Sequence, residues 1–145
     1  MYFDQYMSIY NHFTVLGAKM KVTFSSYDTN TVPLSVGLWQ NDDLSITPTT
    51  FQGQVESSKG KQAVIGTGGD SKAVLELRWS AKDTFGRSPL SDTSLRGDAL
   101  ANPTETSVGV IAIQAGDRVT STQCIATIEM EFISCFFELK DLISS

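Results

Sequence analysis

The chain has 145 residues, with 11 Lys and Arg against 16 Asp and Glu, and a formal net charge of −5 at pH 7. This length fits one domain with its own core, and the charge excludes a freestanding nucleic-acid binder, which needs clustered basic residues to neutralise phosphate. At 41% hydrophobic and 19% charged, the composition excludes a disordered or fibrous chain, and its apolar runs are too short for a membrane-spanning helix.

The first ten residues carry apolar side chains at helical spacing, namely Phe3, Tyr6, Met7 and Tyr10. This spacing predicts a short helix that depends on packing, because it spans only about two turns. From residue 13 the period changes to two, and one face of the segment 13–26 is apolar: Ala18, Met20, Val22 and Phe24. The alternation predicts a strand with one buried face and one wet face.

Further segments have the pattern of strands, at residues 32–39, 62–65, 72–80, 107–114 and 123–138. No long helical pattern separates them, so the sequence predicts an all-β fold, an antiparallel sandwich or barrel. Residues 44–60 are polar and irregular, which predicts a loop. Residues 82–106 form a second stretch without periodicity, and a connection of that length often makes surface or partner contacts.

The two cysteines, Cys124 and Cys135, lie in the last of these strand-like segments. A continuous strand would separate them by roughly 36 Å, whereas a disulfide needs Cα atoms within about 7 Å. We therefore expect two free thiols. With a single histidine and no C-x-x-C spacing, we expect neither a metal site nor a cofactor.

Three features resemble catalytic motifs without completing one. His12 would have to be the base of a hydrolase, but the G-x-S-x-G pattern is absent, and a structural role is expected. The glycine-rich stretch 66–70 lacks the G-K-[ST] ending of a phosphate loop. Glu129 and Glu131 share one strand face, where a solvated or partner-facing stripe is a better explanation than a glycosidase pair. We expect no enzymatic activity.

The lysines allow two interpretations. Lys19 and Lys21 share the polar face of the first strand, and Lys140 lies near the end of the last. All three are candidates for a surface that faces nucleic acid. They are equally candidates for pairing with Glu129 and Glu131 across neighbouring strands, which we favour.

The candidates for a subunit interface or a surface loop are Arg87, Arg96, Trp39 and Trp79. The two arginines lie in the 82–106 connection, and the tryptophans lie near strand ends. Core or subunit contacts suit the tryptophans better than sugar stacking. In the alternative function, a β-sandwich that binds a carbohydrate or a receptor, the tryptophans and the connection would form the site.

The segment Phe3–Phe24 (FDQYMSIYNHFTVLGAKMKVTF) resembles a recurring segment of capsid proteins from circular Rep-encoding single-stranded DNA viruses, the circovirus-like group. There, a short helix with an F-x-Q-Y…Y pattern leads into a Y-x-V-x-x-x-K-x-K-V-x-F strand. The matching positions, with Phe13 in place of the usual tyrosine, are Phe3, Gln5, Tyr6, Tyr10, Phe13, Val15, Lys19, Lys21, Val22 and Phe24. The segments Leu77–Gly86 and Ile125–Ser145 are similar to later parts of the same family, in the same order.

The resemblance implies a viral jelly roll, in which the strands would be D (13–26), E (32–39), F (62–65), G (72–80), H (107–114) and I (123–138). The sheets of that fold run B-I-D-G and C-H-E-F. The resemblance also implies self-assembly with other copies into a small icosahedral shell around single-stranded DNA. The chain would then act in the virion and, during assembly, in the host nucleus; a host receptor is a further expected partner, and a membrane is not.

Members of this family begin with an Arg-rich arm and strands B and C, whereas this chain begins at the helix before strand D. We therefore expect one jelly-roll domain over residues 1–145 that is truncated at its N-terminus and holds about six of the eight strands. Strands H and I would become open sheet edges. The genome would be bound mainly through a basic arm outside these residues.

Overall fold

The structure is a computed structural model that describes residues 2–27, 29–42, 50–57, 60–68 and 71–141. Its helices are α1 (Phe3–Ile9), α2 (Phe51–Ser57) and α3 (Ala81–Phe85), with a short 3-10 turn, η2 (Thr93–Leu95). Its strands are β1 (Tyr10–Ser26), β2 (Leu34–Asn41), β3 (Gly60–Ile65), β4 (Lys72–Ser80), β5 (Arg96–Gly97), β6 (Val108–Ala115) and β7 (Cys124–Leu139). Strands hold 52% of the described residues, so the predicted all-β class is confirmed. None of the helices described is long and apolar enough to cross a bilayer.

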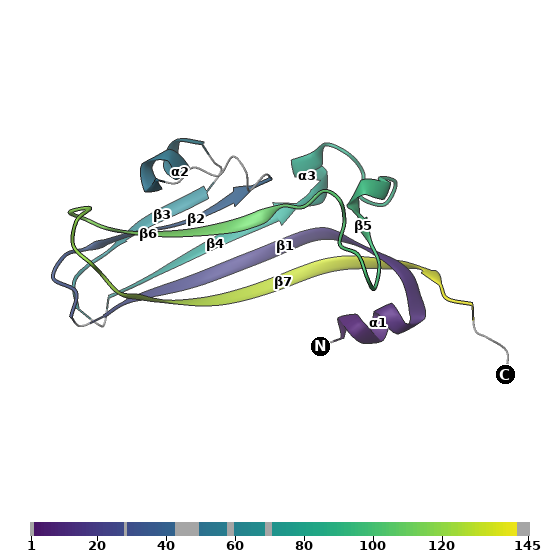
Figure 1. Cartoon of the computed structure of the whole chain (residues 1–145), viewed down its shortest axis with the longest axis horizontal. Helices are drawn as coiled ribbons and strands as arrows, with labels where there is room; N and C mark the ends of the chain where they lie inside the picture. Colours follow the sequence, from purple (N-terminus) through teal and green to yellow (C-terminus); the bar gives the residue numbers. More distant parts are fainter. Residues whose placement is uncertain (1, 28, 43–49, 58–59, 69–70, 142–145) are drawn as a thin grey trace. The chain divides into compact units, whose positions relative to one another are not determined.

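The strands form two antiparallel sheets (Figure 1). In the first sheet, β1 pairs with β4, β5 and β7. In the second, the strand order is β3-β2-β6. Its register sets Val36 between Ala63 of β3 and Ile113 of β6, so these three side chains share one face.

The chain divides into two compact units. One comprises Lys19–Arg78 and Ser107–Glu131 and is called the sandwich unit below. The other comprises Met1–Ala18, Trp79–Thr106 and Phe132–Ser145 and is called the aromatic unit. The strands β1, β4 and β7 contribute residues to both units. The expectation of a single domain over residues 1–145 stays a prediction.

The core of the sandwich unit lies between its two sheets. Its buried side chains come from β1 and β4 on one side and from β2 and β3 on the other: Val22, Phe24, Leu75, Leu34, Val36, Leu38 and Ile65. These are alternate residues of their strands, as the period-two pattern predicts. Two sheets that each present one apolar face pack face to face to exclude water from both.

Trp39 lies on the other face of β2, opposite the core. Its ring lies over Gly37, where an added Cβ would be 1.7 Å from the indole, and beside Gly60, its cross-strand neighbour. Phe51 of α2 meets the indole edge-on, with ring centroids 5.2 Å apart. Figure 1 shows α2 over β2 and β3. The two glycines leave the space in which this second apolar cluster forms.

Helix α2 corrects the prediction of an irregular loop over residues 44–60. The Thr50 hydroxyl oxygen accepts a hydrogen bond from the Gly53 N–H at 3.1 Å, which caps the start of the helix. A seven-residue helix is too short to be stable by propensity, so its packing on Trp39 holds it. Residues 43–49 and 58–59 of the predicted loop lie outside the described part.

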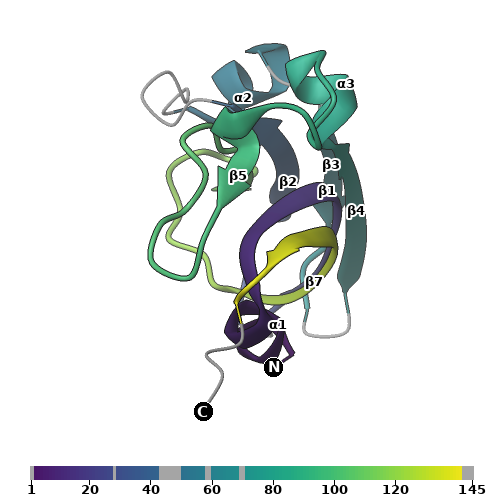
Figure 2. The ribbon, with the colours of Figure 1, turned by 90° about the vertical axis from the view of Figure 1, so that its right-hand side faces the viewer.

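The aromatic unit is built around Phe136 of β7. Tyr6 of α1 stacks on its ring at 4.8 Å, and Phe3, Tyr10 and Phe13 pack around it. Figures 1 and 2 place α1 beside the start of β1 and the end of β7. The helix predicted over the first ten residues is confirmed, and its aromatic face provides the packing that so short a helix requires.

The 82–106 connection contains more regular structure than its sequence pattern predicts. Helix α3 ends at Gly86, whose left-handed backbone (φ 65°) lets its N–H donate to the Lys82 carbonyl at 2.9 Å. Further on, β5 pairs with β1 and sets Gly97 opposite Phe13. The connection is therefore attached to the first sheet within the aromatic unit.

Candidate interaction surface

The outer face of the β4-β1-β7 sheet carries a charged stripe in the sandwich unit. Lys19 Nζ lies 3.7 Å from a carboxylate oxygen of Glu76 on β4 and 3.7 Å from one of Glu131 on β7. Lys21 Nζ lies 3.0 Å from Glu129 Oε1. The sign of charge thus alternates from strand to strand. The pairing of the two lysines with the β7 glutamates, which the sequence favours, is confirmed.

Sequence reasoning missed Glu76 as a member of this stripe. Arg78 Nε donates to Glu76 Oε1 at 2.9 Å, and this bond, together with the positive charge of Lys19, lowers the pKa of Glu76 below its ordinary value. The available signal was the alternation in 72–80, which puts Glu76 and Arg78 on the same outer face. A role of Lys19 and Lys21 in facing nucleic acid stays a prediction.

Lys140 belongs to the aromatic unit, where it joins the end of β7 to α1. Its Nζ donates to the Met7 carbonyl at 2.6 Å, and its backbone N–H donates to the Ile9 carbonyl at 2.8 Å. A cation suits this position because the last carbonyls of a helix carry partial negative charge and lack partners within the helix. Its ammonium group is therefore engaged by a backbone carbonyl of α1, and the prediction that Lys140 pairs with Glu129 or Glu131 is wrong.

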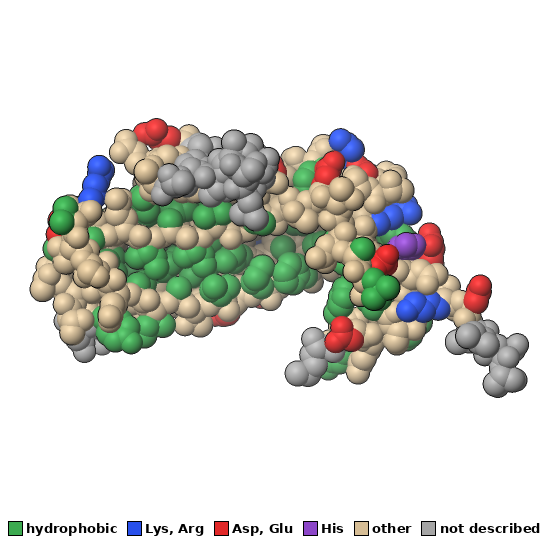
Figure 3. All heavy atoms as spheres, in the orientation of Figure 1, with side chains coloured by type: hydrophobic (Ala, Val, Ile, Leu, Met, Phe, Trp, Pro, Cys, Tyr) green, Lys and Arg blue, Asp and Glu red, His purple; other side chains and the backbone are tan. Residues whose placement is uncertain are grey.

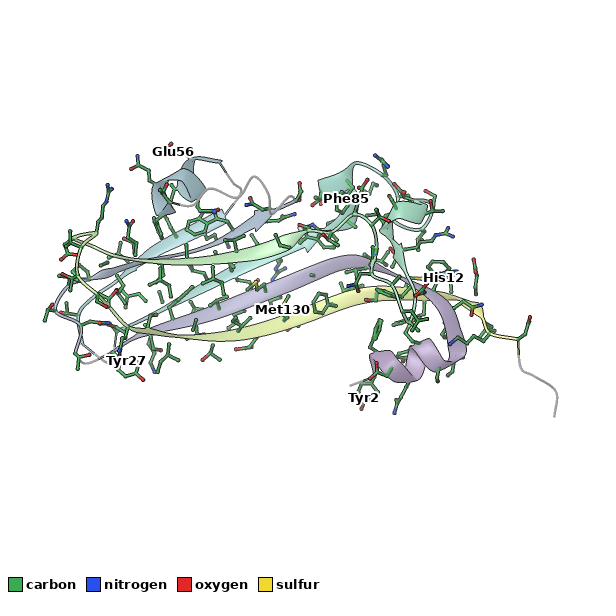
Figure 4. The ribbon with its side chains drawn as sticks, viewed as in Figure 1. Tyr2, His12, Tyr27, Glu56, Phe85 and Met130 are labelled. Atoms are coloured by element: carbon green, nitrogen blue, oxygen red, sulfur yellow. The ribbon has the colours of Figure 1, made fainter. Side chains whose placement is uncertain are left out.

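His12 lies on β1 in the aromatic unit (Figure 4). Its Nε2 lies 3.3 Å from Glu138 Oε2, and its ring lies 5.9 Å from that of Phe137. The guanidinium of Arg96 covers the same phenyl ring at 4.9 Å and donates to the Leu90 carbonyl at 3.0 Å. His12 thus lies beside the Glu138 carboxylate and the Phe137 ring, and its structural role stays a prediction.

The second arginine of the connection, Arg87, is held by Asp92. Its Nη1 lies 2.9 Å from Asp92 Oδ2. Asp92 Oδ1 also accepts from the backbone N–H and the hydroxyl of Ser94, and these hydrogen bonds are the main cause of its lowered pKa. Both arginines thus order the connection from within. Their role at a subunit interface stays a prediction.

Trp39 makes core contacts, one of the two kinds of contact that the sequence favours for it. The residue is 2% exposed, since the sheet lies beneath the indole and α2 covers it. Trp79 is half-buried, and its ring meets Phe85 of α3 edge-on at 6.1 Å. Trp39 therefore has no free face on which a sugar could stack.

Two strand edges of the sandwich unit are open. Within the described residues, β7 pairs with β1 alone and β6 pairs with β2 alone. Val36 is fully buried, yet Ile113 beside it on β6 is 42% exposed, and Ile128 and Met130 on β7 are 50% and 52% exposed. Figure 3 shows apolar side chains gathered between β6 and β7, and Figure 4 labels Met130 among them. This apolar surface and the two edges beside it are called the open edge below.

The expectation of free thiols is confirmed for Cys124 and Cys135. Burial raises the pKa of the Cys124 thiol, which packs against the core of the sandwich unit. Across the described part of the chain, no group of three or more histidine, cysteine, aspartate or glutamate side chains is placed to hold a metal ion.

The charged stripe and the open edge are thus the surfaces with the clearest capacity for interaction. The charged stripe is polar, and its lysines and glutamates form ion pairs within the chain. The open edge is apolar, and within the described residues its strands each lack a neighbour on one side. Comparison of the chain with protein-family models, curated proteins and solved structures finds no match.

Proposed function

We propose that this chain is a structural capsid protein whose activity is self-assembly into a small icosahedral shell around single-stranded DNA. The strand order supports the proposal best. With β1, β2, β3, β4, β6 and β7 as strands D to I, one sheet joins β7, β1 and β4, and the other runs β6-β2-β3. These are the neighbours I-D-G and H-E-F that a jelly roll requires. Viral capsids are among the proteins that use this double-sheet fold.

The open edge supports the same proposal. In a jelly roll, strands B and C lie next to I and H, and those are the positions at which β7 and β6 lack a neighbour in the described residues. Assembly proteins act through surfaces rather than through a catalytic set. Exposed apolar side chains at Ile113, Ile128 and Met130 are groups that association can bury.

The charges of this chain suit a part of the shell better than a surface that binds the genome. Lys19 and Lys21 are paired with glutamates, and the net charge of the whole chain is −5. Phosphate binding needs unpaired basic groups. In the proposed function the DNA is therefore held mainly by the basic arm that the resemblance implies. The alternative of a sugar-binding module is weaker, because Trp39 is buried.

The experiment that tests the proposal is sedimentation velocity of the purified chain over a range of concentrations, with negative-stain imaging of the fastest species. Closed particles of uniform diameter are expected. A monomer at every concentration that binds a glycan array would overturn the proposal in favour of the binding module.

A variant in the 82–106 connection sharpens this test, because a connection of that length often makes partner contacts. Leu100 is 99% exposed, so Leu100→Asp should leave the fold unchanged and abolish the particles. Val119→Asp is the matched control, since Val119 is also highly exposed and lies outside the connection. Equal loss of assembly in both variants would contradict a specific role of the connection.

A further inference from the structure

His12, the single histidine of the chain, lies on β1 with a carboxylate on each side. On one side, β5 pairs antiparallel with β1 and sets Phe13 opposite Gly97, so the same register sets His12 opposite Asp98. On the other side is β7, where a carboxylate oxygen of Glu138 lies 3.3 Å from His12 Nε2. Figure 3 shows the imidazole at the surface beside acidic side chains.

The backbone of Glu138 has an unusual conformation that brings its carboxylate to His12. Side chains alternate between the two faces along a strand. Phe136 stacks on Tyr6 of α1, whereas the ring of Phe137 lies on the side of His12. By this alternation Glu138 would share the face of Phe136, but its φ of 61° interrupts the pattern and the carboxylate lies beside His12. A residue other than glycine rarely adopts such a left-handed backbone, and the strain persists where surrounding contacts outweigh it.

Asp98 joins the same site to an exposed turn of the 82–106 connection. Its Oδ1 accepts hydrogen bonds from the N–H groups of Leu100 and Ala101, each at 2.7 Å. These two bonds lower the pKa of Asp98 below its ordinary value, and the charge of His12 acts in the same direction. The carboxylate therefore keeps its charge at mildly acidic pH. It holds the 98–101 turn, which presents the 99% exposed Leu100.

Protonation of His12 changes the charge balance of this site between about pH 5 and 8, the range in which histidine ordinarily titrates. The cation that β5 contributes, Arg96, keeps its charge throughout and lies against the ring of Phe137 at 4.9 Å. When His12 is neutral, Glu138 and Asp98 face an uncharged ring. When it is protonated, a cation lies between them, and opposite charges on neighbouring strands stabilise their pairing.

We propose that His12 is a pH-sensitive switch, whose protonation holds the end of β7 and the 98–101 turn more firmly to β1. The cation attracts Glu138 and Asp98 together, so both segments become more ordered as the pH falls. This switch acts within the aromatic unit and does not require the chain to form shells, so it stands apart from the proposed function.

Amide hydrogen exchange of the full chain, measured by NMR at about pH 5.5 and about pH 7.5, tests this inference. The rates are corrected for the intrinsic dependence of exchange on pH. Protection of the amides in residues 98–101 and 137–140 is expected to be about threefold greater at the lower pH, the scale of a half-exposed ion pair. Protection that is equal at the two pH values in both segments would overturn the inference.

Three variants identify the groups responsible. His12→Gln should abolish the increase in protection in both segments, because it removes the group that gains a proton. Glu138→Gln removes one carboxylate, so the increase should disappear in 137–140 and remain in 98–101. Glu129→Gln is the matched control, since Glu129 lies on the same strand with a similarly exposed side chain (59% against 54%) but is paired with Lys21, and lysine keeps its charge in this pH range. An increase that persists in His12→Gln, or one that disappears in Glu129→Gln, would refute the switch.

Discussion

Replacing Leu38 with alanine tests how much the buried core of the sandwich unit contributes to the free energy of unfolding. Leu38 is fully buried on β2, in the middle of the core. The substitution removes three carbon atoms, which lowers stability by about 2.4 kcal/mol through lost transfer free energy. A cavity left in a packed core raises the expected loss to about 3–4 kcal/mol. That is a large share of the stability of an ordinary domain.

Ile113→Ala is the matched control, because it removes the same number of carbons from the neighbouring strand β6 on the same face. Ile113 is 42% exposed, so its buried share amounts to about 1.4 kcal/mol, and no closed cavity forms. Urea unfolding followed by the fluorescence of Trp39, in a Trp79→Phe background, reports on the sandwich unit. Equal losses for the two variants would refute the reasoning, since Ile113 would then be covered in solution.

Three further predictions follow from single contacts. Gly37→Ala should destabilise the chain by about 1–3 kcal/mol and shift the emission of Trp39 to longer wavelength, because the new Cβ displaces the indole towards water; unchanged emission would contradict the packing. Lys140→Met should lower stability by about 1 kcal/mol and speed amide exchange in α1, because the Met7 carbonyl loses its donor; unchanged exchange would argue against this cap. Two backbone N–H groups lower the pKa of Asp98 below its ordinary value of 3.8, so its contribution to stability is present above that pH and lost as the pH falls through the lowered pKa. The melting temperatures of the wild type and Asp98→Asn should therefore converge below about pH 3.8, and a gap that stays constant from neutral to acid pH would contradict this.

The strands could be predicted from the sequence because their signal is local. In β4 the alternation of Ala73, Leu75 and Leu77 with Glu76 and Arg78 marks the strand over 72–80, the bounds that the structure has. In β1 the same alternation predicts the buried positions Val22 and Phe24. Period-two patterning encodes both the strand and its buried face, so no information from elsewhere in the chain is needed.

Features that depend on contacts between residues far apart in the sequence were not predicted. Helix α2 forms because Phe51 packs on Trp39, twelve positions earlier in the sequence, in space left by Gly37 and Gly60. Two glycines within strands were the available signal, since a glycine there marks a close approach of another group. Lys140 is similar: its partner Met7 is 133 residues away, so its charge alone suggested a surface role.

The most direct test of the central claim, that this chain is a self-assembling shell protein, is cryo-electron microscopy of its purified assemblies. The account predicts closed icosahedral particles in which each copy holds the β7-β1-β4 and β6-β2-β3 sheets and adjacent copies touch through the 82–106 connection. Open fibrils joined through the β6 and β7 edges, or isolated monomers at every concentration, would contradict it.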